Sequence, residues 1–266
     1  MPSHPDGPPQ TKHVLDGLVD RYERREFISD DPVSIPHAFD DPCDQEIIGL
    51  FAALLAWGRR SILLSKLAEL VERMEYRPHQ FVTNFSYGQH ATQLAGFRHR
   101  TFQPKDAVAL TLAIQAILHK HGSIEQLFAS FLTKDTPTIE PAIEGTSETL
   151  FSIVPGTPTR LRKHLSRPST GSACKRFAMY ARWMVRPGPV DLGIWTGVSA
   201  SQLVLPLDVH TGRQARRMGL LSRKQNDWKA VLELTDQCRI LAPNDPVRYD
   251  LALFGVGAYG GQEIPL

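Results

Sequence analysis

The sequence has little cysteine and no long apolar run. Its three cysteines, Cys43, Cys174 and Cys238, lie far apart without a Cys-x-x-Cys spacing. They cannot form a four-thiolate zinc or iron–sulfur site by themselves, so we expect no metal and no cofactor. The most apolar stretch, residues 47–57, is shorter than the roughly 20 residues that a membrane-spanning helix needs. We therefore expect a cytoplasmic protein in a reducing compartment, with no membrane partner.

Several catalytic motifs are missing as well. The chain has no Gly-x-Gly-x-x-Gly after a strand, no Walker loop, no Gly-x-Ser-x-Gly and no His-Glu-x-x-His. Nucleotide-dependent and zinc-protease chemistry are therefore poorly supported. Alternating strand patterns and hairpin dipeptides are scarce, whereas helical periodicity is frequent. The sequence predicts an all-α fold, with helices over 12–27, 45–57, 62–74, 105–120, 123–132, 172–185, 209–218, 227–240 and 246–255.

Breaker-rich segments divide this helical chain. Residues 1–10 contain four prolines and no apolar core, so we predict a disordered tail. Residues 133–145, with two prolines, read as a polar linker. We expect two helical lobes with a cleft between them. One lobe is formed by residues 44–170, and the other by residues 11–43 together with 171–266.

The net charge of +2 is unevenly distributed along the chain. Residues 155–225 contain thirteen Lys and Arg against two acids, Asp191 and Asp208. This gives +11 in that window and leaves −9 for the remainder of the +2 chain. A charged run is often only a solvated face. Clustered positive charge in an otherwise acidic protein is also the pattern expected for a phosphate-backbone partner.

Two residues in this basic window are candidates for chemistry. Ser172 can cap the helix over 172–185, which places Lys175 in its first turn, where a cation is disfavoured. Like charges and partial burial both favour a neutral, nucleophilic amine. Asp208 stands where a helix is expected to begin, and a carboxylate beside an amine would take up its proton. A surface lysine and a simple helix cap are the alternatives, and each residue alone favours them.

A second acid lies near the C-terminus. Asp250 and Phe254 are four residues apart, so they share one face of the last predicted helix. They would offer a hydrogen-bond acceptor and a stacking surface to a base. The alternative is a half-buried acid paired with Arg248 or another neighbour, with Phe254 in the core. We interpret His210 as structural, bonded to a loop carbonyl.

The segment Pro206-Leu207-Asp208-Val209-His210-Thr211 resembles the Val-Asp-Thr/Val-His motif of the helix-hairpin-helix (HhH-GPD) DNA glycosylases. In that superfamily the aspartate is catalytic and opens a helix, and bifunctional members carry a preceding lysine. The apolar helix that ends at Trp57 is similar to the one before the base pocket of those enzymes. The hairpin signature Leu-Pro-Gly-x-Gly is missing, and Ser169-Thr170-Gly171-Ser172 stands in its place.

Lys175 and Asp208 are 33 residues apart, a longer interval than in most of the superfamily. The long interval and divergent hairpin are similar to the archaeal 8-oxoguanine DNA glycosylase branch. There an Asp and an aromatic residue four apart contact the damaged base, as Asp250 and Phe254 would here, with Phe in place of Trp. The whole chain also resembles a bacterial family of uncharacterised proteins, in the blocks Asp44-Gln45-Glu46-Ile47-Ile48-Gly49-Leu50, Cys174-Lys175-Arg176, Arg182-Trp183-Met184-Val185-Arg186 and Asp245-Pro246-Val247-Arg248-Tyr249-Asp250.

The resemblance implies a DNA N-glycosylase with associated AP-lyase activity that removes an oxidised purine such as 8-oxoguanine. Lys175 and Asp208 would be catalytic, and the flipped nucleotide would be bound by Asp250, Phe254, Trp57, Met179 and Arg182. Phosphates would be held by Arg176, Arg213 and Arg216, with Arg182.

The implied partner is double-stranded DNA with a damaged base. We expect a monomer associated with the bacterial nucleoid. An iron–sulfur cluster is not expected, because the chain ends at Leu266 without the cysteine loop of some relatives. The alternatives are a non-catalytic DNA-binding or damage-sensing module, and a helical protein whose basic face meets RNA or an acidic protein.

Overall fold

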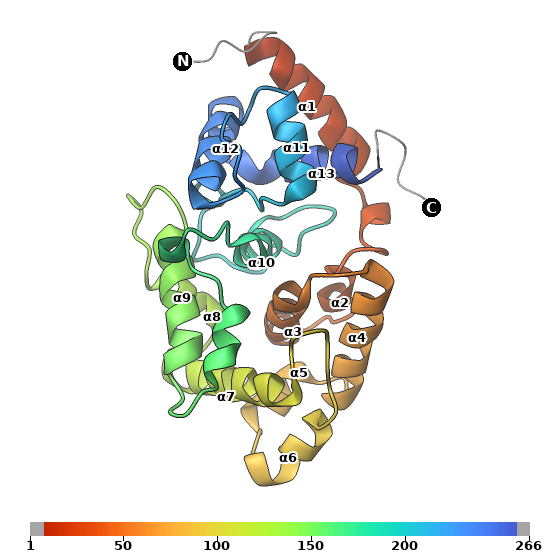
Figure 1. Ribbon diagram of the computed structural model, residues 1–266, viewed down its shortest axis with the longest axis vertical. Coiled ribbons are helices and arrows are strands. Elements are labelled where there is room, and N and C mark those ends of the chain that lie inside the picture. The colour runs from red at the N-terminus through yellow and green to blue at the C-terminus, as the bar shows by residue number, and fades with distance from the viewer. Residues whose placement is uncertain (1–7, 260–266) are drawn as a thin grey trace. The chain divides into compact units, whose positions relative to one another are not determined.

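The structure is a computed structural model and describes residues 8–259. Over these residues the regular elements are all helices, and the only β-type pairs are three isolated bridges. The predicted all-α fold is confirmed. The chain divides into two compact units, whose helices are labelled in Figure 1. Unit 1 comprises residues 1–29, 135–140 and 167–266, and unit 2 comprises residues 30–134 and 141–166.

Unit 1 contains the first helix and the last four. Helix α13 packs against both α1 and α11. Short 3₁₀ turns, labelled η, connect several of the longer helices. The elements of unit 1 are α1 (Pro8–Tyr22), η1 (Arg25–Phe27), η3 (Pro168–Thr170), α10 (Lys175–Val185), η4 (Ala200–Gln202), α11 (Val209–Arg217), α12 (Trp228–Leu241), η5 (Pro246–Tyr249) and α13 (Asp250–Tyr259).

Unit 2 is built around α3 and α7, with shorter helices on both. Helices α2 and α5 pack on α3, and α6 and α8 pack on α7. The elements of unit 2 are α2 (Ser34–His37), α3 (Pro42–Leu55), α4 (Arg60–Arg73), α5 (Pro78–Thr83), α6 (Tyr87–Leu94), α7 (Pro104–His121), α8 (Ile124–Ala129), α9 (Glu140–Ser152) and η2 (Thr159–Lys163).

Helix α3 is the buried helix of unit 2, as its apolar sequence predicts. Every residue from 46 to 55 is buried. Its N-cap is Asp41, whose carboxylate accepts from the N–H of Cys43, although Asp44 before the predicted helix 45–57 is an equally suitable cap by residue type. Asp44 instead accepts from the N–H of His79 at the start of α5 (2.7 Å). The buried Glu46 accepts from the first two N–H groups of α8. Acidic side chains of α3 therefore bind backbone N–H groups at the N-termini of both α5 and α8.

The lobe boundaries differ from those expected. Residues 30–43 belong to unit 2, since α2 packs on α3. Residues 135–140 belong to unit 1, because the N–H of Ile139 donates to the carbonyl of Gln202 and the Gln202 amide donates to the carbonyl of Thr136. The predicted linker 133–145 is too long, since α9 begins at Glu140. Most of the predicted tail 1–10 lies outside the described residues, but α1 already begins at Pro8.

Within residues 8–259 no helix combines the length and the apolar character that crossing a bilayer requires.

Candidate active site

Asp208 reaches the start of α11 at the end of a buried apolar segment. Residues 203–207 are all buried, and the N–H of Leu205 donates to the hydroxyl of Thr235 on α12 (3.1 Å). One oxygen of Asp208 then accepts from the N–H groups of His210 and Thr211, at 2.8 and 2.9 Å. The carboxylate is therefore the predicted N-cap, fixed in orientation, and its second oxygen takes no part in the cap.

Lys175 lies in the first turn of α10, as predicted, but the helix begins at Lys175 itself, three residues later than expected. The N-cap is Cys174, in a left-handed conformation with φ of 47°, and Ser172 instead accepts from the N–H of Cys174. The segment before α10 is held by a bridge between Ser172 and Asp227, the N-cap of α12. These contacts fix the backbone from which the lysine side chain extends.

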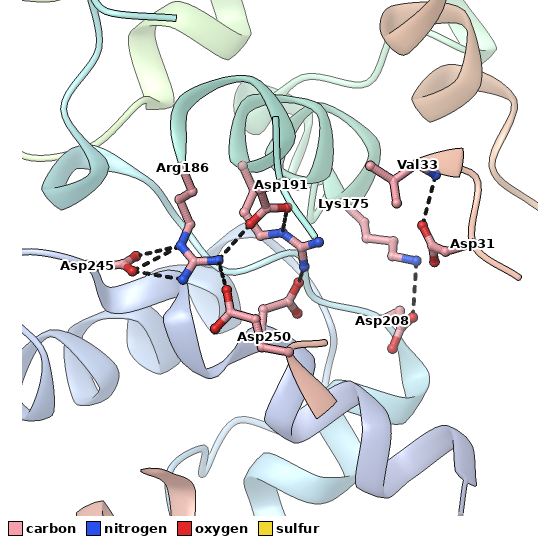
Figure 2. A network of polar contacts seen from close by, with 10 residues as sticks. Asp31, Val33, Lys175, Arg186, Asp191, Asp208, Asp245 and Asp250 are labelled. Carbon is pink, nitrogen blue, oxygen red and sulfur yellow. Dashed lines mark hydrogen bonds and ion pairs between the residues drawn. The ribbon is translucent and has the colours of Figure 1, made fainter. Parts of the chain in front are cut away.

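The two candidate residues meet. The Nζ of Lys175 lies 3.2 Å from Oδ2 of Asp208, with their side chains 31% and 20% exposed (Figure 2). The Phe254 ring lies beside the amine, with its centroid 5.8 Å from Nζ. Burial alone would raise the pKa of Asp208, but the charge of Lys175 and the N–H of Thr211 outweigh it and lower the pKa. The site therefore joins an accessible amine, an ionised carboxylate and an aromatic ring.

Asp250 borders this pair from a buried position. It is 5% exposed and forms an ion pair with Arg182, which lies two turns after Lys175 on α10. Burial raises the pKa of Asp250 to about 6, against the opposing charges of Arg182 and Lys175. The alternative of an acid paired with a neighbouring residue is thus met by Arg182 and not by Arg248, which binds Asp16 instead (3.2 Å).

A chain of buried charges continues from Arg182. Its Nε donates to Asp191 (3.1 Å), and the other oxygen of Asp191 accepts from Arg186 at 2.6 Å. Arg186 also binds Glu23 and Asp245, so it stands between acids from three segments (Figure 2). Burial works against the charged form, but the acids prevail and raise the pKa of Arg186. These pairs fix α10 against the segments around it.

Arg182 was predicted to contact substrate or phosphate, and the phosphate contact is wrong. The side chain is only 3% exposed, and its charge is taken up by two carboxylates. Arg216 is half-buried and donates to the carbonyl of Arg223 and to Asn226, so it holds a loop. Arg213 is exposed on α11, and Arg176 is half-buried, where burial lowers its pKa.

The remaining predicted residues lie in two different units. Met179 is buried one turn after Lys175 on α10. Trp57 belongs to unit 2, where its ring stacks on His164 with centroids 5.2 Å apart and meets His99 edge-on at 5.0 Å. The structural interpretation of His210 agrees with the contact of its Nδ1 with the Gly257 carbonyl, in a helix and not in a loop (3.0 Å).

The sequence interpretation missed three polar residues around the site. Asp191 lies in a loop among glycines and prolines, and it joins both buried arginines. Glu23 comes from the far end of the chain to bind Arg186. Asn226 donates to the backbone carbonyl of Asp208 (2.8 Å). The sequence held one signal for these acids. Arg182 and Arg186 lie four residues apart in and directly after an apolar helix, and buried arginines need acidic partners.

Two features of the described residues bear on other chemistries. No group of three or more His, Cys, Asp or Glu between residues 8 and 259 is arranged to hold a metal ion. A cavity of about 570 Å³ lies in unit 1 beside Glu23, Arg186 and Asp245, and neither Lys175 nor Asp208 lines it. Arg186, the most buried of the charged residues that line it, already has three acidic partners, so Lys175 and Asp208 remain the stronger candidate.

Over residues 31–259 the chain matches the family described as "Protein of unknown function (DUF2400)". Comparison with curated proteins and with solved structures finds no match.

Proposed function

The chain belongs to the DUF2400 family, whose description names no activity, and we propose from its site that it is a DNA glycosylase with associated AP-lyase activity. The observation that carries the proposal is the 3.2 Å contact between Lys175 Nζ and the Asp208 carboxylate, in an accessible position beside Phe254. The resemblance of residues 206–211 to the glycosylase motif supports the same assignment. It also suggests an oxidised purine such as 8-oxoguanine as the base.

The chemistry begins with a proton transfer. Lys175 gives a proton to Asp208, which is within hydrogen-bonding distance, and becomes a neutral amine. The amine then forms a bond to C1′ of the flipped nucleotide as the N-glycosidic bond breaks. The electron pair of that bond leaves with the base, which takes up the proton held by Asp208. Asp208 is then ionised again and stabilises the positive charge that develops at the sugar.

The lyase step follows from the covalent intermediate. Opening of the sugar ring gives a Schiff base between Nζ and C1′, which acidifies the proton on C2′. Removal of that proton expels the 3′ phosphate by elimination, and hydrolysis of the Schiff base frees the lysine. Phe254 lies where it can stack on the nucleotide, since its ring adjoins the amine.

Borohydride trapping tests the proposal, because it reduces a Schiff base to a stable adduct. Wild-type protein is expected to give a covalent adduct on a duplex with 8-oxoguanine or an abasic site. Lys175→Ala should give none while still binding the duplex. Lys224→Ala is the matched control, since Lys224 is an exposed lysine of the same unit, and its adduct should equal that of wild type. An adduct that persists in Lys175→Ala would assign the chemistry to another group.

A non-catalytic DNA-binding or damage-sensing module is the second candidate. It is favoured because Asp208 already has a structural role: it caps α11 and forms an ion pair with Lys175. These contacts explain the residue without any catalytic function. The absence of an adduct on a panel of lesions, with salt-sensitive duplex binding intact, would select this module. Binding that does not change between about 50 and 200 mM salt would contradict both candidates, because phosphate contacts release counterions.

A further inference from the structure

Unit 2 carries no net charge, but its charges are strongly segregated. It contains thirteen Lys and Arg and thirteen Asp and Glu. Three segments, residues 57–66, 95–105 and 155–166, hold nine of the thirteen cations and none of the acids. The rest of the unit has four cations against all thirteen acids. The three segments are therefore positively charged and the rest of unit 2 is negatively charged, although the two sum to zero.

The three segments, far apart in the sequence, meet around Trp57. Its ring contacts His99 of the second segment and His164 of the third, and its carbonyl lies 3.0 Å from Nε2 of His99. Arg160 of the third segment donates to the carbonyl of Thr101 in the second (2.6 Å). These contacts hold the segments together, so the cations extend from an ordered backbone and not from a flexible tail.

The cations fall into two groups. Arg160, Lys66 and Arg162 are engaged with Asp106, Glu69 and Glu148, and the buried Asp106 lies directly after the second segment. The exposed cations on the segments include Arg59, Arg98, Arg100 and Lys105. Acidic side chains therefore neutralise part of the positive charge, and a separate set of exposed cations remains available to a partner.

Both the backbone and the side chain of Arg100 are constrained by the residues around them. Its backbone has a left-handed φ of 52°, in the turn closed by the His99–Phe102 bridge. Its side chain lies over Gly58, where an added Cβ would come within 2.8 Å of Nη1. Burial lowers the pKa of His99 and the charge of Arg100 lowers it further, which leaves a neutral ring between two exposed arginines. Backbone strain of this kind collects at functional positions.

We propose that the surface formed by residues 57–66, 95–105 and 155–166 binds the phosphodiester backbone of duplex DNA. Three of its four exposed cations named above are arginines, whose planar guanidinium groups bind phosphate in a bidentate manner. Because the surface is held by ring contacts, little order has to be imposed when DNA binds. The inference rests on the proposed function only in taking DNA as the partner, and it requires no chemistry at Lys175.

A triple variant tests this surface. Arg59→Ala/Arg98→Ala/Arg100→Ala is compared with Arg77→Ala/Lys120→Ala/Lys134→Ala, which removes three exposed cations of unit 2 outside the three segments. Both variants lose the same charge, so long-range electrostatics change equally. Binding to a lesion-free duplex is measured against salt concentration. We expect the test variant to lose about 0.9 in the slope of log K against log salt for each phosphate contact removed.

The control variant should keep the wild-type slope. Arg59→Lys/Arg98→Lys/Arg100→Lys restores the charge and should restore most of the slope, and thermal unfolding checks that every variant is folded. Equal losses in the test and control variants, or no loss in either, would overturn the proposal. So would displacement of the duplex by polyglutamate as readily as by competitor duplex DNA, because an acidic protein would then be the better partner.

Trapping separates this proposal from the proposed function. The test variant should still form the borohydride adduct when DNA saturates it at low salt. If wild-type protein forms the adduct but the test variant keeps the wild-type salt slope, the DNA-binding surface is wrong and the proposed enzymatic function stands. A slope that falls as expected in a protein that forms no adduct would support the surface and contradict the enzyme.

Discussion

Asp208 has two roles that substitution can separate. It caps α11 through two backbone N–H groups, and it pairs with Lys175. Asn and Ser are good N-caps without charge, whereas Ala neither caps nor pairs. Replacing Asp208 by Asn, Ser and Ala therefore removes the charge in all three variants and the cap in only one.

The structure sets the expected magnitudes. Loss of an N-cap costs about 0.5–2 kcal/mol of folding free energy, and the partly exposed ion pair contributes about 0.2–1 kcal/mol. Asp208→Ala should therefore lose roughly 1–3 kcal/mol, and Asp208→Asn and Asp208→Ser less than about 1 kcal/mol. Because the pKa of Asp208 is lowered in the folded state, the pair stabilises above the unfolded pKa of about 3.9. The difference between wild type and Asp208→Asn should close as the pH falls through the lower, folded value.

Urea unfolding and single-turnover trapping measure the two roles separately. All three variants should form adduct about 10²- to 10⁴-fold more slowly, because each lacks the proton acceptor. If Asp208→Asn traps DNA at the wild-type rate, the carboxylate takes no part in the chemistry. If Asp208→Ala is no less stable than Asp208→Asn, the cap contributes nothing and the separation of roles is wrong.

Three further predictions concern buried acids and their partners. Because the pKa of Asp250 is raised to about 6 in the folded state, the wild type should lose on the order of 2 kcal/mol of unfolding free energy as the pH rises from 4 to 7. Asp250→Asn lacks the titrating group and should not show this loss, so parallel curves of unfolding free energy against pH for the two proteins would contradict the prediction. Arg182→Met should cost about 3–5 kcal/mol in urea unfolding, since it leaves the buried Asp250 without its partner and Asp191 with Arg186 alone, and a cost below about 1 kcal/mol would show that these pairs do not stabilise the fold. Glu46→Ala should cost about 1–3 kcal/mol by leaving two N–H groups at the start of α8 unbonded, whereas an unchanged midpoint would mean that water replaces the carboxylate.

Local patterns predicted the elements that position the candidate site. An acid after a buried apolar run predicted both the start of α11 and its cap. The suitable cap Ser172 predicted Lys175 in the first turn of α10, although the helix begins only at Lys175. Whether these two residues meet depends on how α10 packs against the residues before α11. From the sequence, only the resemblance to the glycosylases predicted this contact. The long-range contact was thus the part that needed the structure.

The errors share a physical cause. Asp44 and Ser172 were suitable caps by type, but a neighbouring residue or another helix used them differently. Arg182 looked like a phosphate ligand because its acids, Asp191 and Asp250, are 9 and 68 residues away along the chain. Residue type limits what a side chain can bind, whereas its partner is decided by tertiary contacts that composition and spacing do not record.

Several features that lower stability coincide at Lys175. A cation at the first position of α10 faces the positive end of the helix. The left-handed Cys174 before it costs about 1–2 kcal/mol, and the buried Asp250 nearby has a pKa raised to about 6. A lysine that served only to stabilise the fold would be expected in the last turn of a helix, where positive charge is favoured. Proteins retain such unfavourable arrangements where function requires them. The cost of this position therefore favours a chemical role for Lys175 over a purely structural ion pair.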